Sequence, residues 1–395
     1  MKIAIINNDF RVYWKDRLSY LQNFLAEKDI DFIAVELFGR GSPYSFDIYD
    51  NKETWWRCLF PNKSSTELSK EEIKKALFST LNEINPAIII APSIVFFAGA
   101  LSISWCKKNK KKFIMFDDAK PFQVKRNFLV QLIKNLIIEQ SDGLWLPSNE
   151  YYKEYSYLHN KDITFFYGYN CINNQLFKFD GERKFNQNTI ICVARLVSIK
   201  NINNLLWAWQ IIEKKDINYK LIIIGNGPDY DSLVQLSTFL SLKRVHFLGT
   251  IDNSNLPVYF FNSDGFILPS LSETWGLVVN EAMAAGLPVL LSNKINSCQS
   301  ILHEGVNGIS FNPLNIMEMA EAIFKYISLD IEAKKAMSSE SLNIINSMDY
   351  ENMGLRLVDA LVKITAKEFK KPGAIAALII NRWYGRYNTS GWDKL

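Results

Sequence analysis

The chain has 395 residues, which is long enough for two domains. It has 45 basic and 41 acidic residues, and the resulting net charge of +4 is too small to indicate nucleic-acid binding. The five cysteines and three histidines are scattered without the spacing of a metal or redox pair. We therefore expect a large soluble enzyme with free thiols in a reducing compartment.

Short β-branched runs alternate with helical stretches in the first half of the chain. This alternation predicts a parallel α/β sheet with right-handed crossovers. The opening MKIAIINND turns polar too soon for a secretory signal and is interpreted as the first strand. The candidate strands are Ile3–Ile6, Phe32–Glu36, Ile88–Ile90, Phe113–Phe116, Gly143–Leu146 and Ile163–Phe166.

The segment 87–105 carries no charge and is long enough to suggest a membrane span. Pro86 and Pro92 bracket its β-branched run, however, and Gly99 follows with several serines. A strand followed by a buried helix to about Asn109 therefore explains the segment better than a transmembrane helix.

The polar stretch 178–188 is typical of a linker, and after it the pattern of strands repeats. We predict two Rossmann-like α/β domains facing each other across a cleft, at 1–177 and 189–366, followed by a tail at 367–395. The second series of candidate strands is Thr189–Val193, Lys220–Ile224, Val245–Leu248, Gly265–Leu268 and Val289–Leu291.

The first two strands of the second series lead into polar turns. The sequence ARLVSIKN places Arg195 and Lys200 in or beside a βα loop, where two cations suit a pyrophosphate leaving group. In the next turn Gly225 and Gly227 would let backbone approach a ligand closely. The third glycine of the dinucleotide fingerprint is absent, and glycines that only turn the chain explain this motif equally well.

The segment 264–292 is the most informative one, with the pattern strand, polar loop, helix, strand. Glu273 and Glu281 bracket the helix start with no other charge between them. An eight-residue helical step spans up to ~12 Å, roughly a nucleotide sugar from ribose to hexose. Amides near Gly276 and Leu277 would lie at the helix N-terminus, which favours phosphate. The segment predicts a sugar-nucleotide site.

In this order and spacing, the motifs ARLVSIKN, GNGPD, VHFLGTI and ETWGLVVNEAMAAGLPV resemble the nucleotide-binding half of a GT-B glycosyltransferase of family 4, a retaining group. The resemblance is close over 189–292 and looser at 146–155 and 166–179. It implies a GT-B fold in which the C-terminal helix, within 367–395, crosses back onto the first domain.

The resemblance also implies roles for particular residues. Arg195 and Lys200 would stabilise the departing nucleoside diphosphate. Glu273 would hold hydroxyls of the transferred sugar, and Glu281 those of the ribose. The leaving phosphate could itself deprotonate the acceptor, so no protein base, metal or other cofactor is expected. The same loops would complete the donor site with Gly225, Gly227, Phe247, Gly249, Thr250, Thr274, Trp275, Gly276 and Leu277.

Two positions depart from the family pattern. Many relatives have paired glycines after the first strand, where this chain has NNDF and Asn8 fills space near the substrates. Many also have a histidine at the end of a later first-domain strand, where this chain has FDDAK. Either Asp117 or Asp118 could orient a hydroxyl there, and we predict Asp118 as a residue of the cleft. The adjacent pair lacks the intervening residue of a metal-binding Asp-x-Asp motif.

These features predict a retaining hexosyltransferase acting on a glycan or lipid-linked glycan acceptor. A UDP-sugar is the favoured donor and a GDP-sugar the alternative, and family analogy suggests bacterial surface polysaccharide synthesis. Two other interpretations stay open: a nucleotide-sugar 2-epimerase of the same fold, and a non-catalytic sugar-nucleotide-binding subunit. Donor turnover separates the transferase from the binding subunit, and product analysis separates it from the epimerase.

Two regions raise the question of peripheral contact with the inner face of the cytoplasmic membrane. In 124–140, Phe128, Leu132 and Leu136 share one helical face, and 367–395 has six basic residues against two acidic ones. Such patterns dock on anionic lipid. We favour a core-facing helix for the first region and packing on the first domain for the second, in a cytoplasmic protein.

Overall fold

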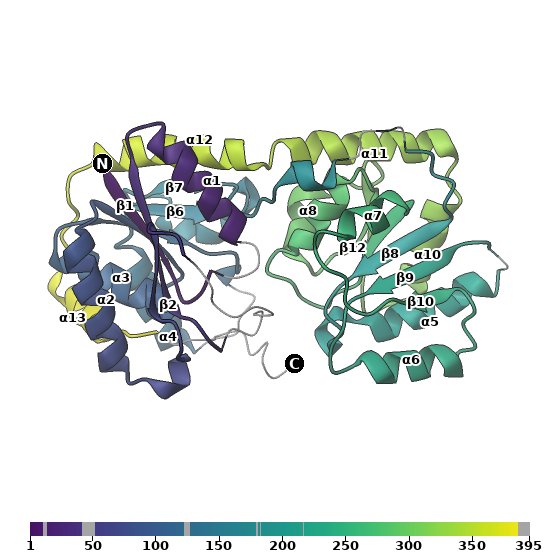
Figure 1. Ribbon diagram of the computed structural model, residues 1–395, viewed down its shortest axis with the longest axis horizontal. Helices are drawn as coiled ribbons and strands as arrows, with labels where there is room; N and C mark the ends of the chain where they lie inside the picture. Colours follow the sequence, from purple (N-terminus) through teal and green to yellow (C-terminus); the bar gives the residue numbers. More distant parts are fainter. Residues whose placement is uncertain are drawn as a thin grey trace. The chain divides into compact units, whose positions relative to one another are not determined.

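The computed structural model describes residues 1–10, 14–41, 52–121, 127–178, 181, 183–215 and 217–385. It divides into two compact units. Of the described residues, unit 1 contains Met1–Tyr169 and 350–385, and unit 2 contains Asn170–Asp349. In each unit, helices lie on both faces of a parallel sheet (Figure 1).

Unit 1 has a sheet with the order β3-β2-β1-β4-β5-β6-β7, and all neighbouring strands are parallel. Its strands are β1 (Lys2–Asn7), β2 (Asp31–Phe38), β3 (Trp56–Phe60), β4 (Ile88–Pro92), β5 (Lys112–Phe116), β6 (Gly143–Leu146) and β7 (Thr164–Tyr167). The connecting helices are α1 (Trp14–Ala26), α2 (Lys70–Ile84), α3 (Phe97–Lys108) and α4 (Phe128–Ile138).

Unit 2 repeats this topology with the order β10-β9-β8-β11-β12-β13. Its strands are β8 (Thr189–Val193), β9 (Lys220–Ile224), β10 (Val245–Phe247), β11 (Gly265–Leu268), β12 (Val289–Ser292) and β13 (Gly308–Phe311). Its helices are α5 (Ile202–Glu213), α6 (Tyr230–Phe239), α7 (Leu256–Phe261), α8 (Leu277–Ala284), α9 (Asn296–Ile301), α10 (Ile316–Ile327) and α11 (Ile331–Asn346).

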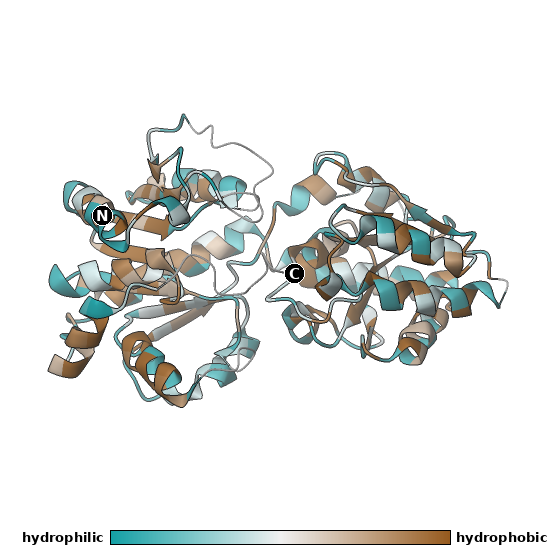
Figure 2. Cartoon of the chain, turned by 90° about the horizontal axis from the view of Figure 1, so that it is seen from below, coloured by the Kyte–Doolittle hydropathy of each residue, from teal (hydrophilic) through white to brown (hydrophobic). Residues whose placement is uncertain are grey.

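Burial explains why the strands are continuous apolar runs. Ile190, Ile223, Ile267 and Leu290 in unit 2 are fully buried, because helices cover both faces of a parallel sheet. The strands of unit 1 are likewise drawn mainly as hydrophobic in Figure 2. All eleven predicted strands are confirmed. The strands β3 and β13 were not predicted, because Arg57, Gly308 and Ser310 interrupt their apolar runs.

The uncharged segment 87–105 forms β4 and most of α3, as predicted. Helix α3 is buried from Phe97 to Lys107 and is capped at Asn109. Within the described ranges, no helix combines the length and apolar character needed to cross a membrane.

The C-terminal segment belongs to unit 1, as the predicted fold requires. Helices α12 (Tyr350–Thr365) and α13 (Ala374–Arg382) lie there, so the chain returns to unit 1 at Tyr350 and not at the expected residue 367. Helix α12 packs on α1 and β7 because its Met353, Leu357 and Leu361 form a buried stripe. The Tyr20 and Tyr350 rings meet at 5.5 Å across this contact.

The expected linker 178–188 is largely part of unit 2, which begins at Asn170. The Arg183 guanidinium donates hydrogen bonds to the carbonyls of Phe260, Ser263 and Ala285. It thereby satisfies the C-terminal ends of α7 and α8, where carbonyls have no partner inside the helix. Burial lowers the pKa of Arg183 to about 10.

Candidate functional site in the second unit

The loop after β8 carries both predicted cations. Arg195 is exposed and Lys200 lies in a 3-10 turn, Ser198–Lys200, directly before α5. The turn ends at Asn201, whose φ of 59° is left-handed and whose amide donates to the carbonyls of Pro269 and Pro313. Cys192, beneath this loop in β8, is a neutral thiol, because burial raises its pKa to about 12.

The glycine loop after β9 packs directly on the loop after β8. A Cβ at Gly225 would collide with the carbonyl oxygen of Ala194, and one at Gly227 with that of Leu196. The amide of Leu196 in turn donates to the carbonyl of Asn226 at 2.9 Å. Both glycines are therefore needed for close packing of the two loops, which is the structural role left open by the sequence.

The loop after β11 reaches the same edge, because β11 is paired with β8. The Lys200 ammonium forms an ion pair with the Glu273 carboxylate, whose Oε1 also accepts the Ser270 hydroxyl at 3.1 Å. The two charged side chains are only 17% and 10% exposed. The fold thus brings together a predicted phosphate-binding cation and a predicted sugar-binding acid, at the point where the strand order reverses.

The start of α8 is shaped by Gly276 and Trp275. Gly276 is the N-cap residue with a φ of +90°, a conformation in which glycine is favoured. The Trp275 side chain is buried and its Nε1 donates to Asn280 Oδ1 at 2.9 Å, so the ring belongs to the core of unit 2. The amide of Leu277 begins the helix, and it lies at the positive end of the helix dipole.

The remaining predicted residues of unit 2 lie in α8, in the loop before it and after β10. Glu281 lies in the second turn of α8 and is buried. Thr274 accepts a hydrogen bond at its carbonyl from the Asn296 amide at 3.0 Å. Gly249 has a φ of +68° with open space around it, and its carbonyl accepts the Gly225 amide at 2.8 Å. Two further predicted residues beside Gly249 are Phe247, which is half-buried, and Thr250, which is exposed.

The other two predicted residues, Asn8 and Asp118, lie in unit 1. Each follows a strand, β1 and β5, so both lie at the carboxyl edge of that sheet. The buried Asn8 accepts the amide of Ala98 at 3.1 Å and so caps α3. The carbonyl of Asp118 accepts the Tyr151 hydroxyl at 2.9 Å, and Asp117 Oδ1 accepts the amide of Ala119.

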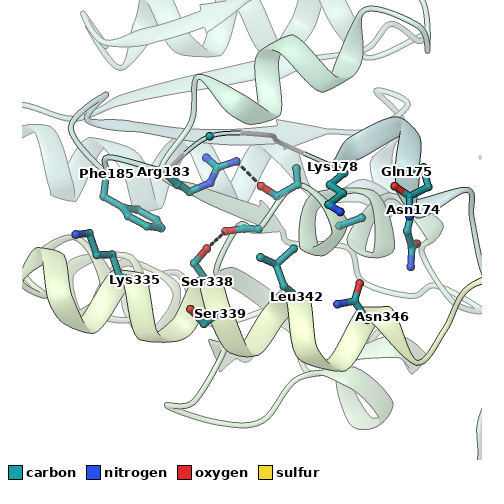
Figure 3. Close-up of a pocket in the computed structure, with 14 residues that line it drawn as sticks. Asn174, Gln175, Lys178, Arg183, Phe185, Lys335, Ser338, Ser339, Leu342 and Asn346 are labelled. Atoms are coloured by element: carbon teal, nitrogen blue, oxygen red, sulfur yellow. Dashed lines mark hydrogen bonds between the residues drawn. The ribbon is translucent and has the colours of Figure 1, made fainter.

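A cavity of about 450 Å³ lies elsewhere in unit 2, between the stretch 174–185 and α11 (Figure 3). Its wall includes Arg183, Lys335 and the end of α8, and none of the predicted site residues lines it. Helix α8 runs from the carboxyl edge of the sheet to the amino edge, so its end lies away from the loops described above. We assign the candidate site to those loops and not to the cavity.

Several residues that build the site gave no signal in the sequence. Ser270 orients Glu273, Asn280 holds Trp275, and Asn296 supports the carbonyl of Thr274. The amide of Asn280 also donates to the carbonyl of Asn170, 110 positions earlier in the chain. The contacts of Asn296 with Thr274 and of Asn280 with Asn170 join segments 22 and 110 positions apart, so local spacing could not have identified them.

The chemistry of this edge suits a ligand with a negative end and a hydroxyl-rich end. Arg195 and Lys200 can neutralise phosphate, and the amides at the start of α8 can donate to it. Glu273 and Glu281 can accept hydrogen bonds from hydroxyl groups. A nucleotide sugar carries both kinds of group.

Comparisons with known proteins support this interpretation. Residues 173–343 match the family model of glycosyl transferases group 1. The alpha-monoglucosyldiacylglycerol synthase of Acholeplasma laidlawii is 35% identical over 123 residues, which are 31% of each chain. Among the first curated relatives, the chain spans between 31% and 47% of their length.

Solved structures resemble the chain over nearly its whole length. Sucrose-phosphate synthase from Thermosynechococcus elongatus has a TM-score of 0.71 at 18% identity, covering 93% of this chain and 99% of that one. Anabaena HepE, in complex with UDP, has a TM-score of 0.70 at 16% identity, covering 92% and 100%. This likeness confirms the predicted fold class, two Rossmann-like domains of the GT-B type.

Proposed function

We propose that the chain is a glycosyltransferase that moves a sugar from a nucleotide sugar to a hydroxyl of a glycan or lipid-linked glycan, because it has the GT-B fold and its residues 173–343 match the glycosyl transferases group 1. The observation that carries the proposal is the ion pair of Lys200 with Glu273 at the reversal point of the unit 2 sheet. In this proposal Lys200 would bind the diphosphate and Glu273 would bind the sugar, so the ion pair supports a site for both parts of the donor. A nucleotide without a sugar would use only half of this site.

In the proposed reaction, configuration at the anomeric carbon is retained. The bond from the anomeric carbon to the β-phosphate oxygen breaks, and its electron pair stays on that oxygen. The acceptor hydroxyl oxygen bonds to the same carbon on the same face, and its proton passes to the departing phosphate. Arg195 and Lys200 stabilise the charge that develops on this phosphate. The site then needs no protein base and no metal.

We favour a hexose and a UDP donor, with a GDP-sugar as the alternative. Anabaena HepE, which shares the fold, was solved with UDP. The name of the Acholeplasma relative, a monoglucosyldiacylglycerol synthase, describes a glycolipid. These two proteins support a uridine nucleotide and a lipid-linked acceptor at a membrane surface, in the synthesis of surface polysaccharide or glycolipid.

The test is a thermal-shift titration with UDP, GDP, ADP and CDP, with and without EDTA. A ligand that binds the folded state raises its apparent stability by mass action. We expect one diphosphate to stabilise the wild type, with no change in EDTA, and the shift to vanish in Arg195→Ala/Lys200→Ala. A matched control is Lys214→Ala/Lys243→Ala, which removes two exposed cations elsewhere in unit 2.

The same preparation is then assayed for sugar transfer with the donor of the selected base. Nuclear magnetic resonance of the product should show the anomeric configuration of the donor. A folded wild type that no diphosphate stabilises would contradict the donor site. An inverted product would contradict the proposed stereochemistry but not the site.

A further inference from the structure

The cavity in unit 2 is a polar groove between the stretch 174–185 and one face of α11 (Figure 3). The lining residues of α11 run from Lys335 to Asn346 and share one side of the helix. At a rise of 1.5 Å per residue this face is about 16 Å long. Figure 3 shows Lys335 and Phe185 toward one end of the groove, and Asn174 and Asn346 toward the other. The groove therefore has room for a ligand whose two ends differ in chemistry.

Cationic side chains line this groove, and within the described part of the chain no aspartate or glutamate does. The cations are Lys178, Arg183 and Lys335. Lys335 forms an ion pair at 3.4 Å with Glu332, whose side chain is 82% exposed, so water weakens this pair and leaves Lys335 able to contact a ligand as well. Two acids of the same stretch, Asp180 and Glu182, lie outside the described residues. The wall that the structure describes is thus positively charged.

Arg183 is the cation in this wall that most needs a counter-charge. Its guanidinium donates hydrogen bonds to the carbonyls of Phe260, Ser263 and Ala285, and among the described residues it forms no ion pair. Burial acts against the charge and lowers the pKa of Arg183 to about 10. The negative end of α8 repels an anion only weakly here, because Arg183 and Ser338 donate to the carbonyls at and just after that end. An anion in the groove would supply the counter-charge that Arg183 lacks.

The other end of the groove presents side-chain amides, from Asn174, Gln175 and Asn346. The Asn174 amide nitrogen donates to the carbonyl of Ile345 at 2.9 Å, which fixes the side chain against the end of α11. Asn174 Oδ1 is buried, and no described residue donates to it. A buried acceptor without a donor is unfavourable, so a hydroxyl group of a ligand would stabilise this end. Amides can both donate to and accept from hydroxyl groups.

We propose that this groove is a second ligand site, which binds a small phosphorylated molecule with a hydroxyl-bearing body. The phosphate lies near Arg183 and Lys335, where charge-assisted hydrogen bonds hold it, and the hydroxyls lie toward Asn174 and Asn346. A volume of about 450 Å³ suits a ligand of this size. The loops after β8, β9 and β11 do not line the groove, so the site is separate from the donor site and does not depend on the proposed function.

The test is isothermal titration calorimetry of the full chain with ribose 5-phosphate, inorganic phosphate and ribose. We expect ribose 5-phosphate to bind most tightly, phosphate more weakly and ribose not measurably. The groove variant Lys178→Gln/Lys335→Gln should weaken the binding of ribose 5-phosphate about tenfold or more, because two charge-assisted hydrogen bonds are lost. The donor-site variant Arg195→Ala/Lys200→Ala should bind ribose 5-phosphate like the wild type, because neither residue lines the groove.

A second variant, Ser339→Glu, adds a carboxylate at an exposed position of α11 in the groove wall and should abolish binding. The matched control is Lys214→Gln/Lys243→Gln, which removes two exposed cations elsewhere in unit 2 and should bind like the wild type. Circular dichroism and the diphosphate thermal shift, measured on every variant, report folding and the donor site separately. A folded wild type that binds neither phosphate compound would overturn the proposal. So would ribose that binds as tightly as ribose 5-phosphate, or binding that the donor-site variant loses and the groove variant keeps.

Discussion

The two sheets share one topology, but their carboxyl edges have different chemistry. In unit 2 this edge carries Arg195, an ion pair between Lys200 and Glu273, and two glycines packed against a neighbouring loop. In unit 1 the same edge is aromatic, with Trp14 packed on Phe116 at 5.1 Å and stacked on Tyr169 at 6.2 Å. The strand order therefore fixes where a ligand can bind, and the loops decide which ligand.

Electrostatics sharpen this contrast. Burial, with the nearby Asp118 and Asp117, raises the pKa of Tyr169 well above its usual value. Burial likewise raises the pKa of Tyr155. The buried phenols beside the unit 1 edge therefore stay neutral. This edge has no counterpart of the cations of unit 2, which suit a diphosphate, among the residues named here.

The largest expected effect is the loss of sugar transfer when the charged carboxyl edge of the unit 2 sheet is changed. Glu273→Gln keeps an oxygen for Ser270 but removes the carboxylate that pairs with Lys200. We expect sugar transfer to fall about 10²- to 10³-fold, as when one group that positions charge at a reacting centre is lost. Steady-state kinetics with Asp231→Asn as control measures this, since Asp231 is an exposed acid at the start of α6. Equal activity of the two variants would contradict the role of Glu273.

The next effect separates packing from backbone conformation. Gly227→Ala forces a methyl group into the carbonyl oxygen of Leu196, and we expect it to destabilise unit 2 by about 3 kcal/mol. Gly249→Ala meets no neighbour within 4 Å and should cost only about 1 kcal/mol, from its positive φ. Denaturant unfolding of both variants measures the difference. Similar costs would mean that the two loops do not need their close contact.

A smaller effect is expected where the loop before α8 is braced. Trp275→Phe removes the donor to Asn280 Oδ1 and leaves a buried acceptor without it, at a cost of about 1–3 kcal/mol. The diphosphate shift should shrink because the amides at the start of α8 lose their fixed position. Trp207→Phe on α5, where the ring is only half-buried, is the control. If the diphosphate raises the melting temperature of Trp275→Phe as much as that of the wild type, the hydrogen bond between Trp275 and Asn280 does not contribute to diphosphate binding.

Asp118→Ala tests the other edge. If Asp118 orients an acceptor hydroxyl, transfer should fall about tenfold, the value of one hydrogen bond to a charged group. The diphosphate shift should stay at the wild-type value, because unit 2 alone carries the proposed donor site. Kinetics and thermal shift on one preparation give both numbers. Unchanged turnover would remove Asp118 from the site.

The smallest expected effect concerns Asn8. Asn8→Ala removes the acceptor for the Ala98 amide at the start of α3, which should cost about 1 kcal/mol of stability. Asn8→Asp, which keeps the acceptor, should restore most of that stability. Thermal unfolding measures both variants. If Asn8→Ala instead abolishes transfer at unchanged stability, Asn8 contacts substrate, as the sequence predicted.

The sequence alone determined the strands and the type of fold. Runs such as Ile88–Ile90 and Thr189–Val193 are continuous and apolar because both faces of the sheet are covered. They can therefore be recognised as strands without knowing which strands they pair with. The loop residues Arg195, Lys200 and Glu273 were also visible, because polar residues that follow a buried strand stand out. The strand β13 lacked that contrast, because Gly308 and Ser310 interrupt its apolar run.

Only the tertiary structure decided how these residues are used. The pairing of Lys200 with Glu273 depends on β8 and β11 lying side by side, and the Asn280 amide donates to the carbonyl of Asn170, 110 positions earlier in the chain. The return of the chain to unit 1 at Tyr350 was equally invisible, since an amphipathic helix shows that it has an apolar face but not which unit covers it. Local pattern fixes the elements because it reflects burial, whereas partners are set by contacts between segments far apart in the chain.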